Sequence, residues 1–172
     1  MTHKEQIQNA IIKELRICQR LFTLLPKDSY DYRPQEGMRS TLELLQSITF
    51  WASWSIESYL TAEKEVRKTL FDKYNDHSKT MKPENFIQRM DEQIEKVNEL
   101  MKGISDEDLL NKKITLRSGE EVLLGQIIID ASLKWPTGYK MQLFLYAKMS
   151  GLKELHTGDA WVSQYGDEEE SD

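Results

Sequence analysis

Apolar residues recur at helical spacing through the first part of the chain. In steps of three and four residues, they are Ile7, Ile11, Leu15, Cys18, Phe22 and Leu25. Because an α-helix repeats every 3.6 residues, this spacing places the apolar side chains on one face. The pattern predicts an amphipathic helix from about Lys4 to Leu24, which ends at Pro26 because proline lacks a backbone donor.

A second predicted helix is apolar around much of its circumference. Ser40 and Glu43 form a capping-box pattern, in which the two side chains satisfy exposed amides at a helix start. The pattern predicts a helix from Thr41 to about Lys68. A helix this apolar must be covered on more than one side. Its apolar residues are Leu42, Leu45, Ile48, Phe50, Trp51, Ala52, Trp54, Ile56, Tyr59 and Leu60.

The chain then becomes polar before a third amphipathic pattern begins. Residues 71–81 favour a connection between helices. The stripe that predicts the third helix consists of Phe86, Met90, Ile94, Val97 and Met101. Gly103 ends this helix, and Ser105 caps a short acidic turn after it, where acidic side chains suit the positive end of a helix dipole.

A small extended excursion and a long last helix complete the pattern. The apolar residues that flank a polar turn, and so favour the excursion, are Ile114, Leu116 and Val122. The last helix is predicted from about Leu123 to Ser150, with Gly151 as its C-terminal cap. Pro136 removes one backbone donor, so we expect a kink near Ser132.

The length and the tail define the expected domain organisation. At 172 residues and 39% hydrophobic content, the chain suits one domain with a substantial core, and the predicted helices indicate an all-α fold over residues 1–152. Residues 153–172 form a tail that ends in an acidic run, which we expect to be partly disordered. Trp161 and Tyr165 interrupt this polarity, so we expect the first part of the tail to dock on the helices or on a partner subunit.

Charge and cysteine content restrict the partners and the environment. Lysine and arginine total 23 against 29 acidic residues, and the net charge of −6 disfavours nucleic acid as a partner. We see no apolar run of about 18 residues, which a membrane span needs, and no secretory signal, so we expect a cytoplasmic protein. The single cysteine, Cys18, excludes an intrachain disulfide and indicates a small buried side chain in a reducing compartment.

Two segments resemble the DinB/YfiT-like superfamily. Residues Leu133–Gly151 are similar to its last long helix, which reads H-x-x-x-H-R-G-Q before an apolar run, a tyrosine, a basic residue and a glycine. The matching positions are Gln142, Leu143, Leu145, Tyr146, Lys148 and Gly151. Residues Arg39–Ile48, RSTLELLQSI, resemble the family's R-S-L-G-E-L-L-A-H-I. The resemblance implies an up-and-down four-helix bundle and a homodimer.

The family binds a divalent metal, zinc, nickel, iron or manganese, through three histidines. Those positions fall on Ser47, Trp135 and Tyr139 in this chain. A catalytic site needs three nitrogen, sulfur or oxygen donors, and these side chains are poor substitutes, so we expect the metal to be lost and no cofactor to replace it. The histidines that the chain does have are expected to be exposed; they are His3, His77 and His156.

A metal site made of carboxylates is an open alternative. Glu43 and Asp130 with waters are conceivable metal ligands, but an ion pair with Lys134, four residues on, explains Asp130 better.

Helical spacing also predicts where a ligand would bind. Glu43, Ser47, Trp51 and Trp54 share one stripe, and Trp135, Tyr139 and Gln142 share another. If the helices pack as in the family, these seven side chains converge. They then form either an aromatic pocket with sparse polar groups or a core in which the tryptophans fill the space of the metal.

Three functions follow from these readings. The first is a metal-free protein that binds a small apolar or aromatic ligand or acts as a dimeric, non-catalytic module. The second, implied by the resemblance, is a metal-dependent thiol transferase or isomerase. The third is a metal-independent reaction with Glu43 as general base or Tyr139 as acid, for which we expect the tryptophans to raise the pKa of Glu43.

Overall fold

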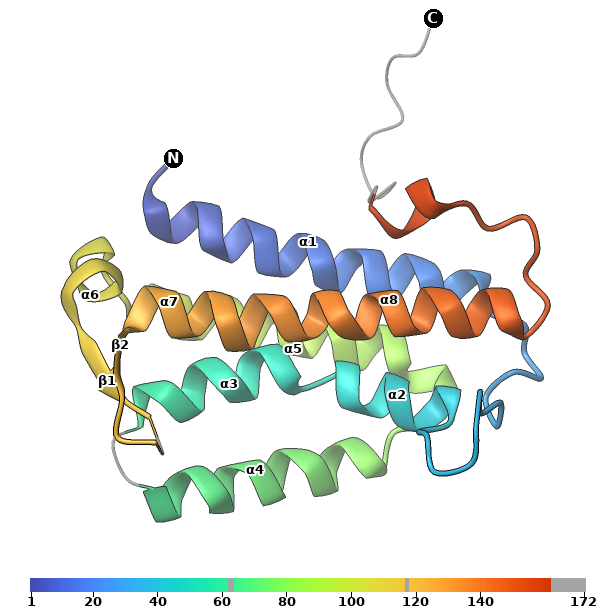
Figure 1. Ribbon diagram of the computed structural model, residues 1–172, viewed down its shortest axis with the longest axis horizontal. Coiled ribbons are helices and arrows are strands. Elements are labelled where there is room, and N and C mark those ends of the chain that lie inside the picture. Colours follow the sequence, from blue (N-terminus) through green and yellow to red (C-terminus); the bar gives the residue numbers. More distant parts are fainter. Residues whose placement is uncertain (62–63, 117, 162–172) are drawn as a thin grey trace, which may run out of the picture.

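The structure, a computed structural model, describes residues 1–61, 64–116 and 118–161, and most of them are helical (Figure 1). The expected all-α fold is confirmed. The helices are α1 (His3–Leu24), α2 (Thr41–Ile48), α3 (Trp51–Leu60), α4 (Lys64–Lys79), α5 (Phe86–Lys102), α6 (Asp106–Asn111), α7 (Leu124–Ile128) and α8 (Lys134–Met149). Short 3-10 turns cover Pro83–Asn85 and Thr157–Ala160, and a π-helical turn covers Ile129–Leu133.

The long helices lie side by side around one core. Helix α1 packs against α5 and α8, α3 packs against α5 and the π-helical turn, and α4 lies outside α2 and α3 (Figure 1). The expected excursion before the last helix is confirmed as an antiparallel pair, β1 (Lys113–Thr115) and β2 (Glu121–Leu123). None of the helices in the described ranges is both long and apolar enough to cross a membrane.

The predicted second helix is wrong in its length, because it breaks after Ile48. In a continuous helix the carbonyl of Ile48 would accept the amide of Ala52. Here Gln93 of α5 lies between them: its Nε2 donates to Ile48 O at 2.8 Å, and its Oε1 accepts from Ala52 N at 3.1 Å. This buried side chain satisfies both backbone groups, so the chain can change direction inside the core. The start is as expected, with the Ser40–Glu43 capping box formed.

The predicted connection over residues 71–81 is also wrong, because α4 continues to Lys79. This helix reads as polar because it packs mainly against α2 and α3 and leaves much of its surface in water. A few side chains, among them Phe71 and Tyr74, supply its inward contacts to the ring of Phe50.

The last helix is distorted where Pro136 predicts it. The ring nitrogen of Pro136 cannot donate to Ser132, and the turn over Ile129–Leu133 widens to π geometry. The buried hydroxyl of Ser132 lies 2.6 Å from that of Ser55 on α3. A polar contact therefore ties the irregular turn to the neighbouring helix.

The first part of the tail docks on α1 and α8, as expected. Arg20 forms an ion pair with Asp159 at 2.6 Å, and Leu155 and Ala160 are buried. The ring of Trp161 covers the ammonium group of Lys140 at 4.0 Å. Tyr165 and the acidic run lie outside the described residues, and the division at residue 152 stays a prediction.

A buried ion pair lies beneath Trp161. Lys140 of α8 is fully buried, and its Nζ lies 2.9 Å from Oε2 of Glu14 on α1, without the alignment of a hydrogen bond. Cys18 is buried as expected, and burial, followed by the charge of Glu14, raises the pKa of its thiol. Removing one partner of such a pair leaves a charge in the core without compensation.

We predict that Glu14→Gln lowers the free energy of unfolding by about 3–5 kcal/mol, because the ammonium of Lys140 then has no counter-charge. The double variant Glu14→Leu/Lys140→Met removes both charges and should recover most of this loss. Urea denaturation of the wild-type protein, the single variant and the double variant measures the differences in the free energy of unfolding. The exposed pair of Lys113 and Glu121 is the matched control, and Glu121→Gln should cost about 1 kcal/mol or less. A Glu14→Gln loss no larger than this control would contradict the prediction.

Candidate functional site

Five aromatic side chains from three helices meet between α3, α4 and α8. We call them the aromatic cluster: Trp51, Trp54, Phe71, Trp135 and Tyr139. Trp51 lies at the centre, with ring centroids 4.7 Å from Trp135, 5.0 Å from Trp54 and 5.9 Å from Tyr139. Phe71 completes the group at 5.1 Å from Trp54. The structure thus brings together the four aromatic residues that spacing singled out.

Local helical spacing explains how the cluster forms. Trp51 and Trp54 are three residues apart on α3, and Trp135 and Tyr139 are four apart on α8, so each pair shares a face. Phe71 escaped the sequence analysis because it lies in a segment that reads as a polar connection. Its signal was Leu70, Phe71 and Tyr74 at helical spacing, which is weak in so polar a stretch.

The cluster is closed at its base and open at its rim. Tyr139 is 3% exposed, whereas Trp135 is 47% exposed. An open surface depression of about 250 Å³ adjoins the rim, and α8 alone lines it, with Lys134, Trp135, Gly138, Tyr139 and Gln142. Of the seven residues expected to converge, Trp135, Tyr139 and Gln142 line this depression.

Two indole groups inside the cluster have no hydrogen-bond partner. The Nε1 atoms of Trp51 and Trp54 are buried, and no acceptor among the described residues reaches them. A buried donor without a partner costs about 1–3 kcal/mol relative to a satisfied one. The tryptophans are thus held by stacking rather than by polar contacts.

Arg39, to which no sequence pattern assigned a role in a site, links the cluster to a second, more polar cavity. Its guanidinium lies 5.3 Å from the centre of the Tyr139 ring, a cation–π contact. It also lines a cavity of about 520 Å³ together with Arg33, Glu43 and Ser47. Glu43 and Ser47 thus face this polar cavity. Because the helix breaks after Ile48, these two side chains do not continue on one helical face to Trp51 and Trp54.

The expected rise in the pKa of Glu43 is wrong. Its carboxylate accepts two hydrogen bonds from Arg33, at 2.7 and 3.0 Å, and one from the Ser40 amide at 2.7 Å. The Arg33 hydrogen bond, and after it the Ser40 amide, lower the pKa of Glu43. A carboxylate held ionised in this way is a weak general base, so the geometry gives no support to base catalysis by Glu43.

The three positions of the family's metal ligands do not fit a metal ion. The hydroxyl of Ser47 donates to Glu43 O in its own helix at 2.9 Å, and Trp135 and Tyr139 stack on Trp51. In the part of the chain that the structure describes, no three His, Cys, Asp or Glu side chains are grouped to hold a metal.

The other candidate ligands are engaged or dispersed. Asp130 pairs with Lys134 as expected, and hydrogen bonds from Gln126 and then Lys134 lower its pKa. The side chains of His3, His77 and His156 are exposed, as expected, and lie on separate elements.

Comparison with known proteins assigns no family to the chain. No protein-family model matches it, and no curated protein matches it either. The resemblance to the DinB/YfiT-like superfamily therefore rests on the two segments quoted above.

We predict that Arg33→Met raises the pKa of Glu43 toward the ordinary value of glutamate, because the carboxylate loses its strongest partner. Side-chain ¹³C NMR titration measures this change. Since folding lowers this pKa, the stabilisation is present above the unfolded pKa and is lost as the pH falls through the folded one. Asp108 is the control, because its low pKa depends on Ser105 and should not move. A Glu43 pKa above the ordinary value in the unmodified protein would contradict the prediction.

Proposed function

We propose that the chain is a metal-free relative of the DinB/YfiT-like four-helix bundles that binds a small apolar or aromatic ligand on the aromatic cluster. In this proposal, α1, α5, α8 and the α2–α3 pair are the four helices of the up-and-down bundle. The observation that carries the binding site is the half-exposed ring of Trp135, which is stacked on Trp51 beside the open depression.

Binding of an apolar ligand at this rim would be favourable because it removes the exposed face of Trp135 from water. Apolar area removed from water stabilises by about 25 cal/mol per Å², and a planar ligand gains additional energy from stacking on an indole. Lys134 and Gln142 supply polar groups at the edge of the same depression. A mainly apolar surface with a few hydrogen-bonding groups is typical of small-molecule sites.

The alternative, a metal-dependent thiol transferase or isomerase, has less support. Such chemistry needs an ion that lowers the pKa of a bound thiol or water. Because Ser47, Trp135 and Tyr139 do not supply the donors, we derive no catalytic step through a metal.

A second candidate is a dimeric, non-catalytic module, and one surface feature favours it. On α8, exposed apolar side chains recur at helical spacing, namely Trp135, Leu145 and Met149. A second copy of the chain that packs on this stripe would remove it from water, and the family resemblance implies a homodimer as well.

The ligand site predicts saturable binding of the neutral fluorophore N-phenyl-1-naphthylamine, with enhanced probe emission. Trp135→Ala removes the stacking surface and should weaken binding about tenfold. Trp161→Ala is the matched control: Trp161 is 51% exposed but covers Lys140 instead of the cluster. Fluorescence titration that finds no saturation, or equal loss in both variants, would overturn the proposed site.

A metal assay separates this proposal from the transferase alternative. We expect protein purified without an affinity tag to hold no stoichiometric zinc, nickel, iron or manganese, and chelator to leave probe binding unchanged. A stoichiometric ion by elemental analysis, lost on Tyr139→Phe, would favour the metal-dependent enzyme.

The dimer candidate predicts a concentration-dependent dimer in sedimentation velocity. Leu145→Glu places a charge in the α8 stripe and should shift the protein to monomer. Leu110→Glu, at an equally exposed apolar residue on α6, should leave the dimer unchanged. A wild-type protein that stays monomeric at about 100 μM, or a dimer that Leu145→Glu does not weaken, would rule out this stripe as the interface.

A further inference from the structure

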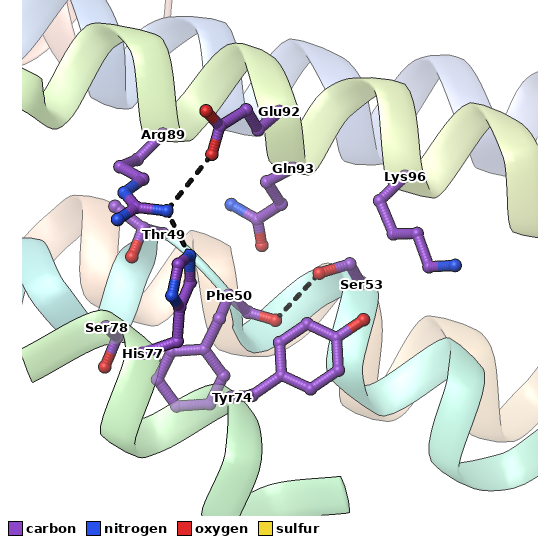
Figure 2. Close-up of a pocket in the computed structure, with 10 residues that line it drawn as sticks. All are labelled: Thr49, Phe50, Ser53, Tyr74, His77, Ser78, Arg89, Glu92, Gln93 and Lys96. Atoms are coloured by element: carbon purple, nitrogen blue, oxygen red, sulfur yellow. Dashed lines mark hydrogen bonds and ion pairs between the residues drawn. The ribbon is translucent and has the colours of Figure 1, made fainter.

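A separate cavity of about 160 Å³ lies between α5 and the α3–α4 pair (Figure 2). Arg89 and Lys96 reach toward it from α5, and Tyr74 and His77 approach from α4. The ring of Phe50 and the hydroxyl of Ser53 come from the start of α3. Phe50 contacts Trp51 and Phe71 of the aromatic cluster, but no residue of the cluster lines this cavity, which is therefore separate from the proposed ligand site.

The cations at this cavity are more buried than the carboxylates that accompany them. Arg89 is 23% exposed and Glu92 48%, with 3.3 Å between them; Lys96 is 34% exposed and Glu99 71%, with 3.4 Å between them. Charge-assisted hydrogen bonds are ordinarily about 2.7–2.9 Å long. Glu92 itself lines the cavity, but at these distances it and Glu99 form only weak ion pairs with the two cations.

Arg89 also contacts a side chain that repels it when charged. Its guanidinium, which has only donors, lies against Nε2 of His77 (Figure 2). Neutral histidine offers a single acceptor there, and protonated histidine offers none. An oxyanion that displaced this contact could accept hydrogen bonds from both side chains and would compensate the charge of Arg89 and that of a protonated His77.

A third basic side chain, that of Lys73, lies near Arg89 and Lys96. A neighbouring cavity of about 360 Å³ shares Tyr74, His77 and Lys96 and adds Lys73. The carboxylate there, Glu57, is engaged by the Tyr74 hydroxyl at 2.5 Å. Burial, followed by the Glu57 hydrogen bond, raises the pKa of Tyr74, so the hydroxyl stays protonated and adds no negative charge.

We propose that this cavity binds a phosphate-type oxyanion through Arg89, Lys96 and His77. The planar guanidinium provides paired donors, Lys96 provides a point charge from the other end of the cavity, and the Ser53 hydroxyl lies between them (Figure 2). The rings of Phe50 and Tyr74, 6.2 Å apart, can hold an apolar group attached to the phosphate.

Calorimetric titration with inorganic phosphate and with phenyl phosphate, at constant ionic strength in chloride, tests the proposal. We expect saturable binding of at least one of them. Tighter binding of phenyl phosphate would support a phosphate monoester as the natural class, and equal affinity would support the free ion. Absence of saturation with both probes would overturn the proposal.

Variants test whether the cavity is responsible. Arg89→Gln and Lys96→Gln each remove a charge-assisted contact and should weaken binding about tenfold or more. Lys113→Gln removes one exposed cation on β1 and should change the affinity less than twofold. Equal weakening in all three would show general charge screening and overturn the site.

A measurement on the wild-type protein tests the site even if the variants do not fold. In ¹H–¹⁵N NMR spectra, phosphate should shift amide signals around Ser53, His77 and Arg89. Shifts confined to other regions would overturn the proposal. Phosphate should not displace N-phenyl-1-naphthylamine, so failure of this site and failure of the aromatic site are distinguishable.

Discussion

The side-chain amide of Gln93 supports the break between α2 and α3, and both candidate sites depend on that break. In a continuous helix, the amide of Ala52 would donate to the carbonyl of Ile48. The side-chain amide of Gln93 instead donates to that carbonyl and accepts from that amide. Without it, two backbone groups would lie in the core without partners, at a cost of about 1–3 kcal/mol each. With it, α3 presents Trp51 to α8 and Trp54 to Phe71 of α4, while Phe50 and Ser53 line the cavity beside α5.

Features that depend on neighbouring residues were predictable from the sequence. The first and third amphipathic helices, the capping box at Ser40 and the distortion before Pro136 all arise within one or two helical turns. The pairing of Trp135 with Tyr139 on one face of α8 is of the same kind. Periodicity, caps and proline chemistry carry this information directly.

Features that depend on distant residues were not predictable. Gln93 lies 45 residues from Ile48 in sequence, and a polar residue on an amphipathic helix gives no sign of such a role. The pKa of Glu43 falls because Arg33, ten residues before it in a loop, reaches back to the carboxylate. Extending one helical stripe from Ser47 to Trp51 assumed a continuous helix, so both the surroundings of Glu43 and its predicted pKa were wrong.

The aromatic cluster has a buried part at Tyr139 and a half-exposed part at Trp135. Contact between the rings of Trp51 and Trp135 links α3 to α8. That structural role requires contact between the rings, and the buried Tyr139 supplies the base. It does not require the outer face of Trp135 to be in water. The open face of Trp135 is therefore the part of the cluster that its packing does not use, and it is the surface on which the proposed ligand would bind.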